Sequence, residues 1–356
     1  MLPVHCQLVE GRTGGGLPGL SLWYDVAKST NVQAYLNIMT LRFFGTLLVL
    51  VLTLFLWPMP QVLADAETMA VPERGFSQAE NDTAAERKFR KGLLWKIQSH
   101  QAKVKTETSY LFGTIHSDDE RVTNLPEVIR TTFNGSSSYA MEVKMDNADL
   151  TAMANAMFFS EDQTLKKLIG PELYQATENA VKAHGLTTEE LNKTKPWVIV
   201  TMLNMPRPKT GVFLDLKLHL EAAGQRKDIY GLETMEEQIA VFDELPIADQ
   251  VSLLKETIAT SGMMNQQLEQ LIQAYLARDL EQLETLSEKL APENKDVYNR
   301  VMDRLLTQRN ARMIERMLPI IKEGNAFIAV GAMHLPGKEG LLQLLEDRGY
   351  RVTPIY

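Results

Sequence analysis

Two short stretches near opposite ends of the chain share one pattern, and this pattern constrains the fold more than any other feature. An apolar run is closed by a glycine, and a histidine follows three residues later, in Ser109–His116 and again in Phe327–His334. Each apolar run predicts a buried strand. Open α/β sheets build their sites at the carboxyl ends of strands, where glycine lets the backbone turn sharply. We therefore expect the two strands to share one sheet and to bring His116 and His334 together.

The remaining periodicity predicts an α/β domain at residues 91–356. Strands are expected at 92–97, 103–115, 136–144, 227–233, 325–331 and 350–355. Apart from the strand at 227–233, the chain from 146 to about 320 follows helical periodicity. Strands at both ends with helices between them predict a central mixed sheet, formed from N- and C-terminal strands, with a large helical insertion.

Composition and charge exclude several classes of protein. The chain has 356 residues, 45% of them hydrophobic and 23% charged, as in an ordinary globular protein. Its net charge of −8 argues against a nucleic-acid partner. The one cysteine, Cys6, precedes the apolar segment described next, so the mature chain would use no thiol as nucleophile or metal ligand.

Residues 39–64 have the organisation of a secretory signal peptide. Arg42 supplies the basic end, Phe43–Trp57 supplies the apolar core, and small residues near Ala64 offer a cleavage site. The apolar run is shorter than the roughly 20 residues that a membrane-spanning helix needs. We expect a periplasmic or secreted protein that meets the membrane only through this segment; an uncleaved anchor is the alternative.

The segments on either side of the signal sequence carry no structural pattern. Residues 1–38 are either a wrongly assigned start ahead of Met39 or a disordered native extension. Residues 65–90 are polar and charged, which predicts a loose leader before the domain.

Two histidines and one glutamate are the first candidates for chemistry. His116 and His334 each follow a glycine at a strand end, and imidazole serves both as a base near neutral pH and as a metal ligand. Glu142 ends a mostly uncharged strand, where a carboxylate is either buried and paired or functional. Satisfied structural histidines are the alternative for the imidazoles.

Five further residues are candidates for the same site. Glu233 closes the internal strand, and its alternative role is an acid near the start of the next helix. Arg309 and Asn310 are expected to open a helix over 310–321, where Arg309 could hold a substrate carboxylate or an oxyanion, or lie solvated at the surface. Gly113, Gly331, Glu233 and Asn310 are the candidate substrate-binding residues, the two glycines through their backbone.

The residue types fit a metal centre, although a metal-free site is also open. Two imidazoles and a carboxylate without a thiol suit a divalent ion such as zinc, manganese or cobalt. Such an ion could activate water and polarise a carbonyl. Without metal, His116, Glu142 and His334 could instead act as a His/Glu general-base system.

The ordered motifs resemble the TraB/PrgY/GumN family, relatives of the TIKI proteases. They are Leu111–His116, Met141-Glu142, Gly231–Thr234, Arg309-Asn310 and Val330–Gly337, and the resemblance covers about 92–356. It implies a fold shared with TIKI, erythromycin-esterase and ChaN-like proteins. It also implies metal-dependent peptidase activity in TIKI-type members, with Gly113, His116, Glu142, Gly331 and His334 at the site and Glu233 and Arg309 as weaker transfers.

Three functional hypotheses follow. The first is an exported metal-dependent hydrolase of peptides, in which His116, Glu142 and His334 bind metal or activate water. The second is a non-catalytic protein that binds a peptide or a small ligand such as haem. The third is a metal-free hydrolase of the esterase type. The sequence leaves the substrate and the oligomeric state open.

Overall fold

The computed structural model of the protein describes residues 88–99, 108–144, 153, 155–160, 162–205, 209–261, 264–289 and 294–356. The predicted extension at 1–38, the signal segment at 39–64 and the leader up to 87 lie outside the described residues. Within the described part of the chain, no helix is long and apolar enough to cross a membrane. The described residues thus cover most of the domain predicted at 91–356.

A six-stranded mixed sheet, in the order β4-β3-β5-β2-β1-β6, organises the domain. The strands are β1 (Leu94–Ser99), β2 (Ser109–Thr114), β3 (Ser138–Val143), β4 (Asp228–Glu233), β5 (Ala326–Gly331) and β6 (Tyr350–Pro354). Neighbours among β4, β3, β5 and β2 run parallel, whereas β1 runs antiparallel to both β2 and β6. Strands from both ends of the domain therefore share one sheet, which confirms the predicted fold class.

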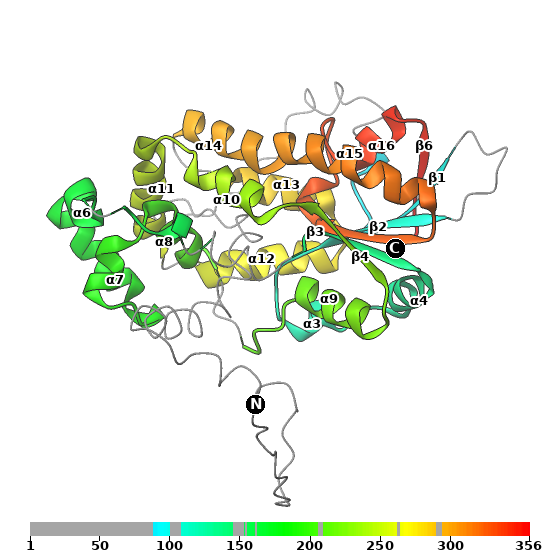
Figure 1. Cartoon of the computed structure of the whole chain (residues 1–356), viewed down its shortest axis with the longest axis horizontal. Helices are drawn as coiled ribbons and strands as arrows, with labels where there is room; N and C mark the ends of the chain where they lie inside the picture. Colours follow the sequence, from blue (N-terminus) through cyan, green and yellow to red (C-terminus); the bar gives the residue numbers. More distant parts are fainter. Residues whose placement is uncertain are drawn as a thin grey trace, which may run out of the picture. The chain divides into compact units, whose positions relative to one another are not determined.

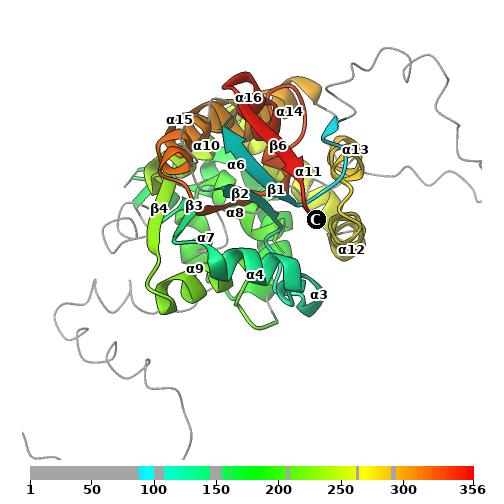
Figure 2. The same cartoon turned by 90° about the vertical axis from the view of Figure 1, so that its right-hand side faces the viewer.

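Helices cover both faces of the sheet and form a group beyond it. Before β4 they are α3 (Glu120–Thr123), α4 (Glu127–Gly135), α6 (Leu165–Val181), α7 (Thr188–Lys193), α8 (Pro196–Leu203) and α9 (Leu214–Gly224). After β4 they are α10 (Met235–Asp243), α11 (Ile247–Thr260), α12 (Met264–Leu276), α13 (Leu280–Lys289), α14 (Lys295–Met302), α15 (Gln308–Glu323) and α16 (Leu341–Asp347). Figure 1 shows α6, α7, α8 and α11 grouped away from the sheet. Figure 2 shows α15 and α16 on one face and α4 and α9 on the other.

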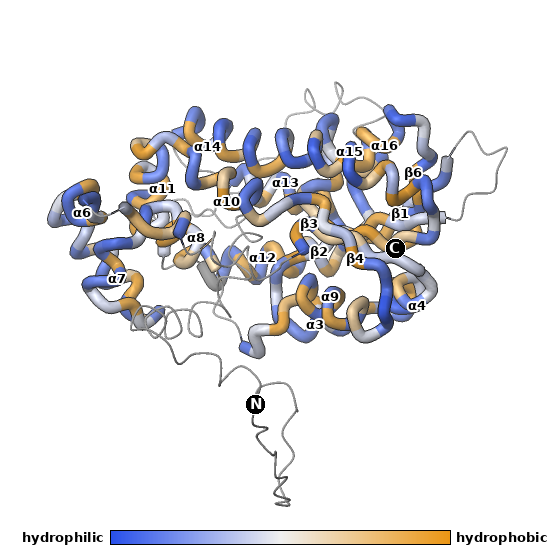
Figure 3. The backbone as a smooth tube through the Cα atoms, viewed as in Figure 1, coloured by the Kyte–Doolittle hydropathy of each residue, from blue (hydrophilic) through white to orange (hydrophobic). Residues whose placement is uncertain are grey.

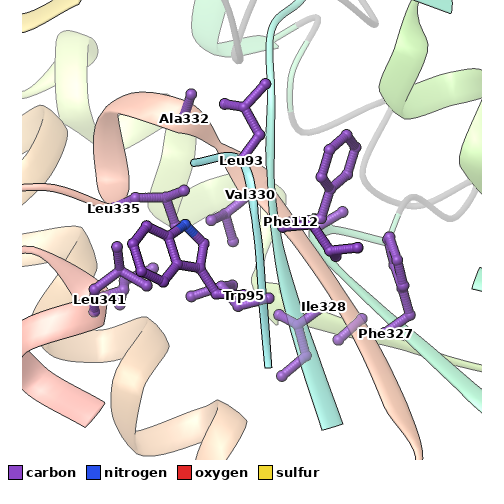
Figure 4. Packing of buried hydrophobic residues seen from close by; sticks show 14 of the residues in the cluster. Leu93, Trp95, Phe112, Phe327, Ile328, Val330, Ala332, Leu335 and Leu341 are labelled. Carbon is purple, nitrogen blue, oxygen red and sulfur yellow. The ribbon is translucent and has the colours of Figure 1, made fainter. Parts of the chain in front are cut away.

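The central parallel strands β3, β5 and β2 are buried on both faces, as parallel strands usually are. Trp95 and Leu341 pack on one side of the strands, and Phe112 and Phe327 lie on the other (Figure 4). The two phenylalanine rings are 5.7 Å apart between centroids, and Phe133 of α4 meets Phe327 edge-on at 5.2 Å. Each such side chain contributes about 1.5–3 kcal/mol when fully buried. This packing holds the register of the strands whose ends carry the candidate residues.

One helix boundary differs from the sequence expectation. Arg309 and Asn310 do not open a helix, because α15 continues from α14 through a π-helical turn over Asp303–Thr307. No proline or glycine interrupts the chain there, so the helix does not stop. Hydrophilic and hydrophobic segments alternate along α15 in Figure 3, and its apolar side chains are buried against the sheet. Arg309 and Asn310 lie on this buried side, which leaves Arg309 no surface position.

Candidate active site

The parallel strands bring the predicted residues to one edge of the sheet. Thr114 pairs with Gly331, and Val143 pairs with Glu233, so β2, β5, β3 and β4 end side by side. A short turn of 3-10 helix, η4 (Ala332–His334), follows β5 directly. The candidate side chains at this edge are all buried: His116, Glu142, Glu233 and His334. The convergence expected from the two Gly-x-x-His motifs is therefore present.

His116 is held by a carboxylate from α9. Its Nδ1 lies 2.7 Å from Oδ2 of Asp215, whose Oδ1 accepts a hydrogen bond from the Thr114 hydroxyl at 2.6 Å. Asp215 is in the first turn of α9, where the helix dipole favours a negative charge. The Leu214 N–H donates to the Ser117 carbonyl at 3.2 Å, which ties α9 to the loop carrying His116. Burial lowers the pKa of His116, but the Asp215 carboxylate outweighs it, and the pKa lies above its ordinary value.

His334 is held by an amide rather than a carboxylate. Its Nδ1 lies 2.7 Å from Oδ1 of Asn310, and the Asn310 amide nitrogen donates to the Glu339 carbonyl at 2.8 Å. Its Nε2 faces Glu142 Oε1 at 3.8 Å. Burial and the Arg309 charge lower the pKa of the His334 imidazole to about 3, although Glu142 opposes this. His334 is therefore neutral at physiological pH.

Glu142 is ionised although it is fully enclosed. Its Oε1 accepts the Gly331 N–H at 2.7 Å, and its Oε2 lies 2.5 Å from Arg309 Nη2. Burial alone would raise the pKa of this carboxyl, but Arg309, His334, His116 and the Gly331 N–H together lower it to about 2. These neighbours keep the Glu142 side chain a carboxylate at the centre of the site.

A buried network behind Glu142 fixes Arg309. Arg309 Nε donates to Glu233 Oε2 at 2.8 Å, and Arg312 reaches the other oxygen of Glu233 at 3.0 Å. The Gln238 amide lies 3.3 Å from both Glu142 and Glu233. Burial lowers the pKa of Arg309, but the two carboxylates outweigh it and raise it above its ordinary value. Arg309 is thus a permanently charged link between the two glutamates.

The donor types fit a divalent metal, but the three predicted ligands do not enclose one. His116 Nε2 is buried without a hydrogen-bond partner among the described residues, and His334 Nε2 faces Glu142 Oε1 at 3.8 Å. An oriented imidazole with its other nitrogen bonded to a carboxylate or amide is typical of metal ligands. In the described part of the chain, however, no group of three His, Cys, Asp or Glu side chains is arranged to hold an ion. Binding would require His116, Glu142 and His334 to move closer together.

The residues predicted to contact substrate have other surroundings. A Cβ on Gly113 would lie 2.7 Å from Leu335 and 3.1 Å from the Ala332 backbone, so this glycine allows the β2–η4 contact and has no room for a ligand. Gly331 donates to Glu142, and Asn310 uses both amide atoms within the protein. Glu233 is enclosed by arginines. These four residues support the site from within the protein, and their contact with a substrate stays a prediction.

Sequence reasoning missed the partners that orient the predicted residues. Asp215 reads as an ordinary acid in the first turn of a helix, and Gln238 reads as a polar position within an amphipathic one. Tyr275 of α12, whose hydroxyl donates to the Gly113 carbonyl at 2.9 Å, reads as a core aromatic.

Comparisons with known proteins identify similar chains. The chain is 24% identical to "Metalloprotease TIKI2" of Xenopus tropicalis over 314 residues, covering 73% of this chain and 59% of that protein. It is 25% identical to "Metalloprotease TIKI1" of Danio rerio, covering 73% of this chain and 62% of the relative. The chain therefore spans about three-fifths of the length of these metalloproteases.

A bacterial relative and a family model complete the comparison. "Uncharacterized protein YbaP" of Shigella flexneri is 26% identical over 248 residues, which cover 67% of this chain and 87% of that protein. No solved structure matches. The α/β fold with its six-stranded sheet and helical insertion is consistent with the TIKI-like fold. The model of the TraB/PrgY/gumN family matches residues 93–354. The chain belongs to the TraB/PrgY/gumN family.

Proposed function

We propose that this protein is a metal-dependent hydrolase that cleaves peptide bonds. The observation that supports it is the meeting of two imidazoles, His116 and His334, beside the ionised Glu142 at the carboxyl edge of the sheet, with His116 Nε2 unpartnered among the described residues. The named metalloproteases among its relatives support the reaction class.

Each residue of the site would have a separate role. His116 Nε2, His334 Nε2 and Glu142 Oε1 would hold the ion. When bound, a divalent metal supplies Lewis acidity toward a carbonyl and lowers the pKa of water. His334 stays neutral and offers a lone pair at any working pH, because its pKa is about 3. Arg309 keeps Glu142 ionised and in place rather than holding substrate, since its donors already face Glu142 and Glu233.

Metal analysis combined with peptide cleavage tests the proposal. The purified full chain is expected to contain a stoichiometric divalent metal and to cleave members of a mixed peptide library. His334→Ala should lose both metal and cleavage, whereas His184→Ala, a histidine at a distant helix end, should keep both. Cleavage that survives in the His334 variant, or in wild-type protein after complete metal removal, would contradict the metal-dependent proposal.

One observation favours a second candidate, a metal-free hydrolase. The Asp215–His116 pair, 2.7 Å apart, has the form of a carboxylate-oriented base whose Nε2 could take a proton from water or a nucleophile. This candidate predicts full activity after chelation and loss of activity in His116→Ala. Activity measured before and after chelation therefore separates the two reactions.

We also propose that the protein acts outside the cytoplasm. The support is the apolar segment Phe43–Trp57 with its preceding Arg42, which has the composition of a secretory signal. Fractionation of cells producing the full chain should place the domain in the periplasm or medium, with an N-terminus near residue 65. Recovery from the membrane at full length would indicate an uncleaved anchor instead.

A further inference from the structure

We propose that Asp215 and Asn310 are positioning residues that fix His116 and His334 in one tautomer, with Nδ1 protonated and Nε2 left unshared. The inference rests on the proposed function for its purpose, because an unshared Nε2 is the form a ligand or base requires. Its geometric basis, two sets of hydrogen bonds, does not depend on any reaction. Neither residue was expected to act on a histidine from its place in the sequence.

The tautomer of His334 follows from a chain of two hydrogen bonds. The Glu339 carbonyl can only accept, so the atom of Asn310 that lies 2.8 Å from it is the amide nitrogen. The opposite atom, Oδ1, must then be the one that lies 2.7 Å from His334 Nδ1. An amide oxygen can only accept, so Nδ1 carries the proton. In a neutral ring, Nε2 is then left with its lone pair.

The tautomer of His116 follows from a carboxylate. Asp215 Oδ2, 2.7 Å from His116 Nδ1, is an acceptor, while Oδ1 is already taken by the Thr114 hydroxyl at 2.6 Å. Both oxygens are therefore fixed, and the carboxylate cannot rotate without losing Thr114. His116 Nδ1 donates, and Nε2 is the nitrogen without a partner among the described residues.

The two positioning residues come from helices on opposite faces of the sheet. Asp215 lies on α9 and Asn310 on α15, and Figure 2 shows these helices on either side of the strands. The two histidines are thus oriented by helices on opposite faces of the sheet. In this arrangement both rings carry their proton on Nδ1, although the partner of His116 is a charged carboxylate and the partner of His334 is a neutral amide.

Nitrogen-15 NMR of histidine-labelled, chelator-treated full chain tests the inference directly. At pH 8, two-bond correlations are expected to show both His116 and His334 protonated on Nδ1. Asn310→Leu should change the pattern of His334 alone, and Asp215→Leu that of His116 alone. Asp215→Asn keeps an acceptor for His116 Nδ1, because the Thr114 hydroxyl can accept from the new amide, and should keep the wild-type pattern. Either ring found protonated on Nε2 and not on Nδ1 in the wild-type chain overturns the inference, whether or not the protein is a hydrolase.

Zinc titration supplies the second readout. Asn310→Leu and Asp215→Leu should each weaken Zn²⁺ binding by about 10- to 100-fold, and Asp215→Asn, which keeps an acceptor for His116, should weaken it less than Asp215→Leu. Asn204 and Asp249 are similarly buried and lie away from the site, so Asn204→Leu and Asp249→Leu are matched controls that should lose stability alone. If the site variants weaken zinc binding no more than these controls do, or if Asp215→Asn weakens it as much as Asp215→Leu, the two residues have only a structural role and the inference is wrong.

Discussion

Replacing Arg309 with methionine removes the charge that two buried carboxylates share. Arg309 Nη2 lies 2.5 Å from Glu142 Oε2 and 2.7 Å from Glu233 Oε2, and all three side chains are less than 5% exposed. Glu233 keeps Arg312 as a partner, whereas Glu142 keeps only neutral donors and the histidines. Leaving one buried charge uncompensated costs about 3–5 kcal/mol. We expect Arg309→Met to lower the free energy of unfolding by that amount at pH 8.

The pKa of Glu142 gives a second route to the same magnitude. In the native protein it falls from 4.5 to about 2, because Arg309 and its other neighbours outweigh burial. At about 1.4 kcal/mol for each pH unit, ionisation stabilises the fold by about 3 kcal/mol above pH 4.5, and this contribution is lost as the pH falls toward 2. Without Arg309, burial would instead raise the pKa of Glu142, so the variant would gain stability as the pH falls from 8 to 5.

Urea unfolding of the chelator-treated chain at pH 8 and pH 5 measures both effects. The difference between wild type and Arg309→Met should be largest at pH 8 and shrink at pH 5. Adding Glu142→Gln to Arg309→Met should recover part of the loss, because the second change removes the uncompensated charge. Arg348→Met, which breaks a largely exposed pair with Glu315, should cost less than about 1 kcal/mol. A loss of that small size for Arg309→Met, or an equal loss at both pH values, would refute the reasoning.

Three further changes test other parts of the structure. Burial and two neighbouring glutamates raise the pKa of Glu284 to about 7 from 4.5, so its ionisation lowers stability as the pH rises through that range. Glu284→Gln should therefore stabilise the fold by about 1–3 kcal/mol at pH 8 and leave it unchanged at pH 4, measured by urea unfolding. Gly113→Ala would place a methyl group 2.7 Å from Leu335, so thermal unfolding should show a loss of about 1–3 kcal/mol. Thr234→Ala removes the capping box of α10 and should cost about 1 kcal/mol, with less helical signal in circular dichroism.

The strands that carry the site were predictable because their signals are local. An apolar run closed by Gly-x-x-His marks the end of a strand wherever it occurs, and parallel pairing then brings His116 and His334 to one edge. The role of Asp215 could not be predicted, since it depends on how α9 docks against the β2 loop more than 90 residues away in the sequence. Asn310 was noticed, but its partner depends on which face of α15 packs against the sheet.

The order of the strands determines where along the sheet edge the proposed reaction would take place. Along the sheet edge, β4, β3, β5 and β2 contribute Glu233, Glu142, His334 and His116 in turn. Arg309 neutralises the glutamate side of this row, because it lies between the two carboxylates. On the histidine side, the described contacts of the two rings run through Nδ1, to Asp215 for His116 and to Asn310 for His334. The proposed hydrolysis would therefore take place over β5 and β2, with the β3–β4 side acting as the charged support that keeps Glu142 facing the histidines.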